Sequence, residues 1–147
     1  GDTRGYGTAV MLVAYDSRKH GMAQIKTCFP MLCVSGSTPE GLCFDAIMKD
    51  ILDASRGKDA YFVNMSDGCP YFEGYYGEGA YNHTRAQVKK MVREGIKVIS
   101  YFICQGSPYG NDKESFQKMY GKEAQFIDTS KIAEVAKTMN SKFLEVA

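Results

Sequence analysis

The chain has 147 residues, of which 44% are hydrophobic and 24% are charged. This length suits a single domain with its own core, since domains most often contain roughly 100–150 residues. Lysine and arginine together number 18 and aspartate and glutamate 17, which gives a net charge of +1. A chain so close to neutral lacks the bulk positive charge that holds proteins on nucleic acid or anionic membranes, so neither partner is expected.

The sequence contains no apolar run of the roughly 18–20 residues that a membrane span needs. It begins at Gly1 without an initiator methionine or a signal-peptide pattern, which favours a processed or trimmed chain. The five cysteines form no CxxC pair and no zinc-binding spacing. Cys28, Cys33, Cys43 and Cys104 lie among apolar residues in the sequence and are interpreted as small buried hydrophobic residues in a reducing compartment, which favours the cytoplasm.

The N-terminal part predicts two strands and a helix. Residues 8–15 form a continuous apolar run, which is typical of a strand buried on both faces. Residues 22–29 partly alternate between apolar and polar, so a second, more exposed strand is predicted there. Thr38, Pro39 and Glu40 suit the cap, the first position and the first turn of a following helix.

Strands and helices alternate in the rest of the chain. Strands are predicted over 61–65, 96–103 and 124–127, and helices over 84–94, 112–120 and from 128 onward, with Ile132, Val135, Ala136, Met139 and Phe143 on one face. The glycine- and tyrosine-rich residues 71–82 are predicted to form a long loop of the kind that is often functional. The alternation indicates an α/β fold: a Rossmann-like, doubly wound, mostly parallel sheet with helices on both faces.

Two polar residues are expected at the ligand-binding edge of this sheet, beyond the carboxyl ends of its strands. Asp67 directly follows a predicted strand, and Thr38 precedes a predicted helix. A carboxylate and a hydroxyl are oxygen ligands of the kind that Mg²⁺ prefers. The alternative is purely structural, with Asp67 closing a turn and Thr38 capping its helix.

Three segments, in this order and spacing, resemble a von Willebrand factor type A domain: GSTPEGL (36–42), YFVNMSDGCP (61–70) and VKKMVREGIKVISYFI (88–103). The likeness covers about residues 8–146, so residues 1–147 are taken as one domain of this type. The most similar branch is the bacterial and phage one, which includes the cobaltochelatase accessory subunit and proteins that work beside MoxR-type AAA+ ATPases.

The resemblance implies a metal-ion-dependent adhesion site that holds Mg²⁺. Thr38 matches the threonine of the family's second loop and Asp67 the aspartate of its third loop. The first loop, D-x-S-x-S, is not found, because the only candidate, residues 16–20, has Arg18 and His20 where serines are needed. The family's first strand and helix are therefore expected to be missing from this chain, which is taken as N-terminally incomplete.

By the same resemblance, the chain is expected to be a non-catalytic adaptor that binds protein partners through the metal. A MoxR-like AAA+ ATPase or a chelatase-type complex is the partner that this implies. The aromatic residues expected to contact the partner, unless their rings pack back on the body of the protein, are Tyr71, Phe72, Tyr75, Tyr76 and Tyr81.

Two other functions remain open. One is a hydrolase or phosphoryl-transfer enzyme that uses Asp67 on a similar sheet, and the other is a structural phage or assembly protein with a degenerate metal site. A nucleophile–base pair of Cys69 and His83 is not favoured, since no third group to orient them is evident. Lys89, Lys90 and Arg93 are interpreted as the solvated face of a helix.

Overall fold

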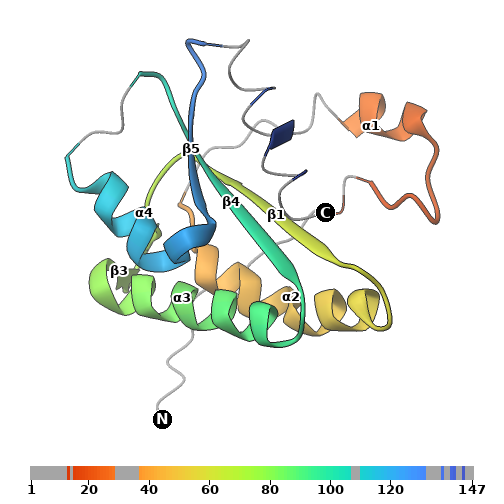
Figure 1. Ribbon diagram of the computed structural model, residues 1–147, viewed down its shortest axis with the longest axis horizontal. Helices are drawn as coiled ribbons and strands as arrows, with labels where there is room; N and C mark the ends of the chain where they lie inside the picture. Colours follow the sequence, from red (N-terminus) through yellow and green to blue (C-terminus); the bar gives the residue numbers. More distant parts are fainter. Residues whose placement is uncertain are drawn as a thin grey trace.

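A computed structural model describes residues 13, 15–28, 37–106 and 110–131, together with residues 137, 140, 141 and 144. Its centre is a parallel sheet of β1 (Tyr61–Ser66), β4 (Lys97–Cys104) and β5 (Ala124–Asp128), in the order β1-β4-β5 (Figure 1). The predicted α/β class and these three strands are confirmed. The arrangement is compatible with a Rossmann-like fold.

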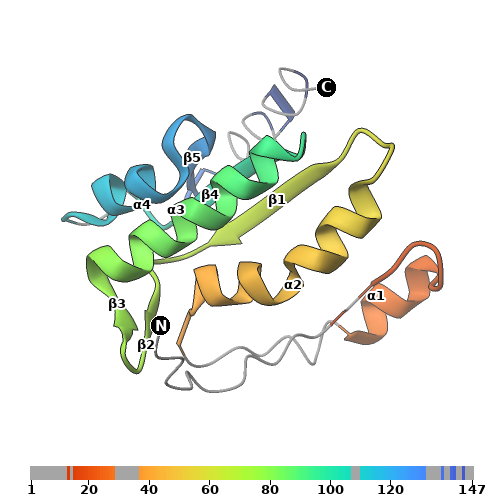
Figure 2. The ribbon, with the colours of Figure 1, turned by 90° about the horizontal axis from the view of Figure 1, so that it is seen from below.

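Three helices pack against the sheet and against one another. They are α2 (Glu40–Ser55), α3 (Gly77–Arg93) and α4 (Asp112–Tyr120), and α3 lies between the other two (Figure 2). A 3₁₀ turn, η2 (Gly121–Glu123), joins α4 to β5. The bounds predicted for α4 are confirmed, because Gly121 takes a φ of +58° that ends the helix.

The main core lies between these helices and one face of the sheet. It consists of Phe44, Met48, Val88, Met91, Ile96, Val98, Phe102, Phe116, Met119 and Tyr120. Side chains of a strand alternate between its two faces, so Ile99 and Tyr101 of β4 belong to a second buried cluster, with Ile127 of β5. Among the described elements, α2, α3 and α4 all contribute side chains to the main core. Helices were predicted on both faces of the sheet, and the described helices of this core cover one face.

The N-terminal predictions have different outcomes. The strand predicted over 22–29 is wrong, because Met22–Cys28 forms a short helix, α1, which lies apart from the other helices (Figures 1 and 2). In so short a segment the spacing of apolar residues does not distinguish a helix from a strand. Its methionine, alanine, glutamine and lysine have high helix propensity and favour the helix. The strand predicted over 8–15 lies mostly outside the described residues.

The long loop predicted over 71–82 is wrong. Strands β2 (Tyr71–Phe72) and β3 (Tyr75–Tyr76) form an antiparallel hairpin, and α3 starts at Gly77, seven residues before the predicted start at Thr84. Gly74 makes the two-residue turn with a φ of +74°. The low helix propensity of the glycines around Glu78 is overcome because Ala80 and Thr84 are buried.

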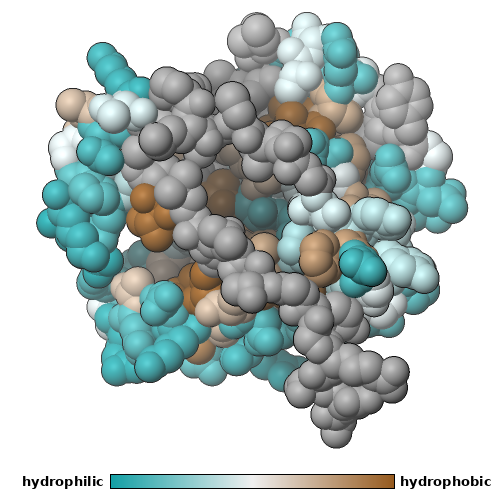
Figure 3. Space-filling model, turned by 180° about the vertical axis from the view of Figure 1, so that it is seen from behind, coloured by the Kyte–Doolittle hydropathy of each residue, from teal (hydrophilic) through white to brown (hydrophobic). Residues whose placement is uncertain are grey.

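The apolar positions predicted for the C-terminal helix lie outside the described residues. Lys137, Asn140, Ser141 and Leu144 have helical backbone and are exposed. Other large hydrophobic side chains also reach the surface, among them Met65, Tyr71 and Tyr76, and the view from behind shows hydrophobic groups between hydrophilic ones (Figure 3). No described helix is long and apolar enough to cross a membrane.

Candidate functional site

Thr38 lies at the carboxyl edge of the sheet, tied to the segment that follows β1. Its backbone N–H donates to the carbonyl of Tyr71 at 3.0 Å, and the N–H of Tyr71 donates to the carbonyl of Thr38 at 3.1 Å. The side chain is exposed, and no side-chain hydrogen bond caps α2, whose N-cap residue is Pro39. The capping role considered for Thr38 is therefore wrong.

Asp67 directly follows β1 and is also exposed. The Ser66 hydroxyl donates to the carbonyl of Gly68 at 3.0 Å, which holds the turn that carries Asp67. The negative charge of Asp67 also helps to raise the pKa of Glu40, the first residue of α2, so the two carboxyl groups interact electrostatically. Asp67 and the start of α2 thus belong to the same edge of the sheet.

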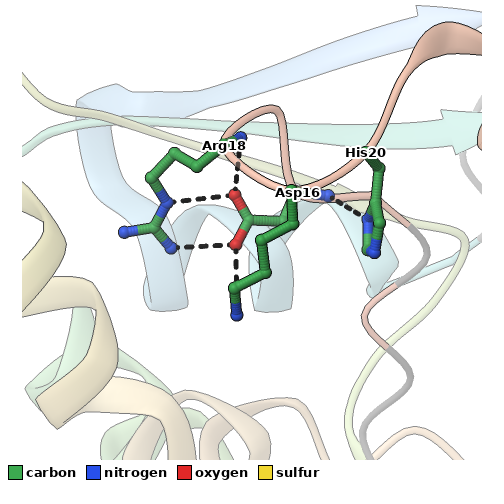
Figure 4. A network of polar contacts seen from close by, with 4 residues as sticks. Asp16, Arg18 and His20 are labelled. Atoms are coloured by element: carbon green, nitrogen blue, oxygen red, sulfur yellow. Dashed lines mark hydrogen bonds and ion pairs between the residues drawn. The ribbon is translucent and has the colours of Figure 1, made fainter.

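Asp16, the only first-loop candidate, is engaged by neighbouring cations instead. Its Oδ1 accepts from the Arg18 Nε at 3.0 Å, its Oδ2 accepts from Nη2 at 3.0 Å, and the Lys19 ammonium lies 3.6 Å from Oδ2 (Figure 4). The hydrogen bonds from Arg18 hold the pKa of Asp16 well below its ordinary range. The His20 ring lies on the other side of Asp16 from Arg18, and its Nδ1 accepts a hydrogen bond from the Asp16 backbone N–H at 3.0 Å (Figure 4). This turn is a local ion-pair cluster rather than a metal loop.

The expected partner-binding aromatic residues divide into exposed and inward-facing groups. Tyr71 and Tyr76 are 65% and 64% exposed and face each other across the hairpin, with ring centroids 6.2 Å apart. Phe72 is half-buried, Tyr75 is buried, and Tyr81 packs against the main core. The surface that a partner can reach therefore centres on the Tyr71–Tyr76 pair.

Tyr75 instead ties α2 to α3 from the inside. Its hydroxyl lies 3.0 Å from the His83 Nδ1 and 3.5 Å from the Thr84 Oγ1, and it receives the N–H of Gly41 in the first turn of α2. The other ring nitrogen of His83 lies 3.1 Å from the Gln87 Nε2. Because both ring nitrogens of His83 already have partners, the pairing with Cys69 gains no support.

A buried polar cluster, which the sequence interpretation missed, supports this edge from beneath. We call it the Asn64 cluster: Glu40, Asn64, Ser100 and Tyr120. The Asn64 Nδ2 lies 2.6 Å from the Glu40 Oε1, 2.9 Å from the Ser100 Oγ and 3.1 Å from the Tyr120 hydroxyl, so its two N–H groups are shared among three oxygens. The cluster joins α2, β1, β4 and α4 at one point. The signal in the sequence was an asparagine inside a strand of otherwise mostly large apolar residues.

Burial dominates the electrostatics of the Asn64 cluster. Glu40 is 5% exposed, and its Oε2 makes no hydrogen bond in the described part of the chain. Burial raises the pKa of Glu40, and the hydrogen bond from Asn64 offsets this only in part. Burial, together with the nearby Glu40 carboxyl, also raises the pKa of Tyr120 far above its ordinary value, which keeps the phenol neutral.

The raised pKa of Glu40 predicts a pH-dependent stability. The folded protein binds this proton more tightly than the unfolded chain, so the stabilisation is complete below the unfolded pKa and is lost as pH rises through the folded pKa. Glu40→Gln keeps the shape without the charge, and we expect it to raise the free energy of unfolding at neutral pH by about 1–2 kcal/mol. Urea unfolding from pH 4 to 8 measures this, and an unchanged pH slope in the variant would contradict it.

The donor set at the edge suits a hard cation but is small. Asp67 supplies a carboxylate and Thr38 a hydroxyl, which match the oxygen preference of Mg²⁺, an ion that commonly keeps several waters. Among the described residues, no group of three or more histidine, cysteine or acidic side chains could hold a metal ion together. Further ligands would therefore be waters, backbone oxygens or an acidic group of a partner.

Three cysteines of the described part are free thiols, namely Cys43, Cys69 and Cys104. All three are partly buried, and burial raises the pKa of each thiol, which favours the protonated form. Cys69 lies 3.9 Å from an Asp112 carboxylate oxygen, and the negative charge of Asp112 adds to this effect. Of the cysteines predicted to be buried, Cys43 and Cys104 are partly buried.

Comparison of the chain with protein-family models, with curated proteins and with solved structures finds no match. The chemistry and geometry of the site must therefore carry the functional argument.

Proposed function

We propose that this chain is a Mg²⁺-dependent protein-binding domain of the von Willebrand factor A type, an adaptor rather than an enzyme. In this proposal Thr38 and Asp67 contribute to the metal site, and an acidic side chain of the partner completes it. The partner is a MoxR-like AAA+ ATPase or a chelatase-type complex, and the protein works in the cytoplasm. The buried, protonated thiols are compatible with that compartment.

The observation that carries the proposal is the pair of backbone hydrogen bonds between Thr38 and Tyr71. They join the segment before α2 to the segment after Asp67, so the hydroxyl and the carboxylate belong to one edge. The exposed Tyr71–Tyr76 pair begins at this same junction. An oxygen-bearing edge beside exposed aromatic rings suits a partner that offers a carboxylate and an apolar surface.

The Asn64 cluster supports the proposal from beneath the edge. A binding site keeps its geometry when the residues that support it are locked by packing and hydrogen bonds. Asn64 links the first residue of α2 to the strand that ends one residue before Asp67. The two segments that carry the proposed ligands are therefore held on a common rigid base.

The test is a titration of Mg²⁺ followed by thermal unfolding. At about 100 times its dissociation constant, the ion should stabilise the folded chain by about 2.7 kcal/mol. Asp67→Ala should abolish this response and Thr38→Ala should weaken it. Asp50→Ala, which removes an exposed carboxylate of α2, serves as the control and should respond like the unmodified chain. Equal responses of Asp67→Ala and the unmodified chain would remove Asp67 from the site.

A further inference from the structure

The opposite edge of the sheet, at the amino ends of the strands, carries a groove that the proposed metal site does not use. Two adjoining hollows of about 420 and 360 Å³ share Val92, Lys122 and Glu123. The first lies between the C-terminal half of α3 and the α4–η2 junction, and the second continues to the start of β4. We call the two hollows together the α3–η2 groove.

One face of α3 forms a wall of this groove, and it alternates cations with valines. Its residues there are Arg85, Val88, Lys89, Val92 and Arg93, which recur at the spacing of a single helix face. The apolar surface at its base comes mainly from Val92, which is 44% exposed, while Val88 and Met119 are buried in its lining. The groove thus offers apolar contact at its base and positive charge along its rim.

The charge of the groove departs strongly from the near-neutral balance of the whole chain. Among the described residues that line it, five are basic and one, Glu123, is acidic; the basic ones are Arg85, Lys89, Arg93, Lys97 and Lys122. The Glu123 Oε1 lies 3.8 Å from the Lys122 Nζ, and the Lys97 Nζ donates to the Tyr61 hydroxyl at 3.1 Å.

Within the described ranges, Arg85, Lys89 and Arg93 make no ion pair and no side-chain hydrogen bond. A solvated helix face explains exposed cations, and the helix dipole favours Arg93 near the C-terminal end. It does not explain why the cations border a hollow with an apolar base.

We propose that the α3–η2 groove binds a short acidic segment of a partner protein that also carries aliphatic side chains. Its carboxylates would pair with the cations of the rim, and its aliphatic side chains would enter the hollow over Val88, Val92 and Met119. The groove favours such a peptide over single-stranded nucleic acid because its exposed apolar side chain is Val92, whereas Tyr120, the aromatic residue among its described lining, is only 3% exposed and offers little ring surface for base stacking. This proposal is independent of the metal site, which lies at the other end of α3.

A fluorescence-anisotropy titration of the full chain tests the proposal. The probe is a labelled peptide of alternating glutamate and leucine, and a peptide with serine in place of leucine and a single-stranded oligonucleotide are compared with it. We expect saturable binding of the leucine peptide and binding of both comparison probes that is weaker by roughly tenfold. Tighter binding of the oligonucleotide, equal binding of the serine peptide or no binding of the leucine peptide would each overturn the proposal.

Variants locate the binding on the molecule. Lys89→Glu, which reverses a rim charge, should weaken binding of the leucine peptide by roughly tenfold or more. Lys90→Glu makes the same charge change at the next residue, which lies outside the lining, and should change binding by less than about twofold. Val92→Ser should weaken binding of the leucine peptide more than binding of the serine peptide. If Lys89→Glu and Lys90→Glu weaken peptide binding equally, the peptide does not bind in the α3–η2 groove. The Asp67→Ala variant should bind the peptide with the affinity of the unmodified chain, whether or not the metal proposal holds.

Discussion

Replacing Asn64 with alanine should destabilise the protein by about 3–4 kcal/mol, the largest effect that we expect from a single side chain outside the apolar core. The two N–H groups of the amide are shared among oxygens of Glu40, Ser100 and Tyr120, which come from three different elements. Its removal takes the 2.6 Å amide contact away from the buried Glu40 carboxyl, whose Oε2 already makes no hydrogen bond in the described part of the chain. Urea unfolding followed by circular dichroism measures the loss.

Met65→Ala is the matched control for this prediction, because Met65 is the next residue of β1, faces away from the main core and is 53% exposed. We expect it to cost less than about 1 kcal/mol. Tyr120→Phe removes one of the acceptors, so its effect and that of Asn64→Ala should be less than additive. Fully additive effects, or a small effect of Asn64→Ala alone, would show that the Asn64 cluster contributes little to stability.

The second large effect is expected for Gly41→Ala in the first turn of α2. A methyl group there would lie 2.3 Å from the Tyr75 hydroxyl, 2.7 Å from the Thr84 Oγ1 and 2.9 Å from the Thr84 backbone nitrogen. The Tyr75 ring is buried and the nitrogen belongs to α3, so neither can move without separating the two helices. We expect a loss of about 3 kcal/mol, at the upper end of the cost of overpacking.

Gly79→Ala provides the control within the same pair of helices. Its added methyl group would meet no atom within 4 Å, and its φ is not positive. Because alanine restricts the unfolded chain and favours helix, we expect a gain of about 0.4–1 kcal/mol. Thermal unfolding of both variants gives the comparison, and similar behaviour of the two would mean that α2 and α3 do not pack as closely as the distances indicate.

Both substitutions also bear on the proposed function. Gly41 and Asn64 lie beneath the edge that carries Thr38 and Asp67, so loss of either should loosen that edge. The α3–η2 groove lies at the other end of α3, next to the start of β4. The proposals for the two edges can therefore fail separately.

Several elements could be predicted from the sequence because their signals are local. The apolar runs of β1 and β4, each close to a glycine, predicted both strands, and the residues from Asp112 to Gly121 predicted the bounds of α4. The start of α3 was missed because Gly77 and Gly79 disfavour a helix, and the burial of Ala80 and Thr84 outweighs that local preference. Helix α1 was missed because seven residues are too few to define a period.

The candidate site was only partly visible in the sequence. Thr38 and Asp67 could be placed at one edge because residues that follow strands or precede helices meet there in a parallel sheet. Glu40 was interpreted as a favourable charge at a helix start, whereas it is a buried acid. Its environment depends on Asn64, Ser66 and Tyr120, which lie far from it in the chain.

The sequence by itself determined the α/β class, the three parallel strands and the residues offered at their carboxyl edge, because period, caps and glycines act over a few neighbouring residues. Only the tertiary structure decided which polar groups are buried and which cations gather around one hollow. Asn64 meets its three acceptors across separations of 24, 36 and 56 residues, and such contacts form only when the helices pack on the sheet. Burial and electrostatic interaction depend on distance in space, and a linear pattern does not carry that distance.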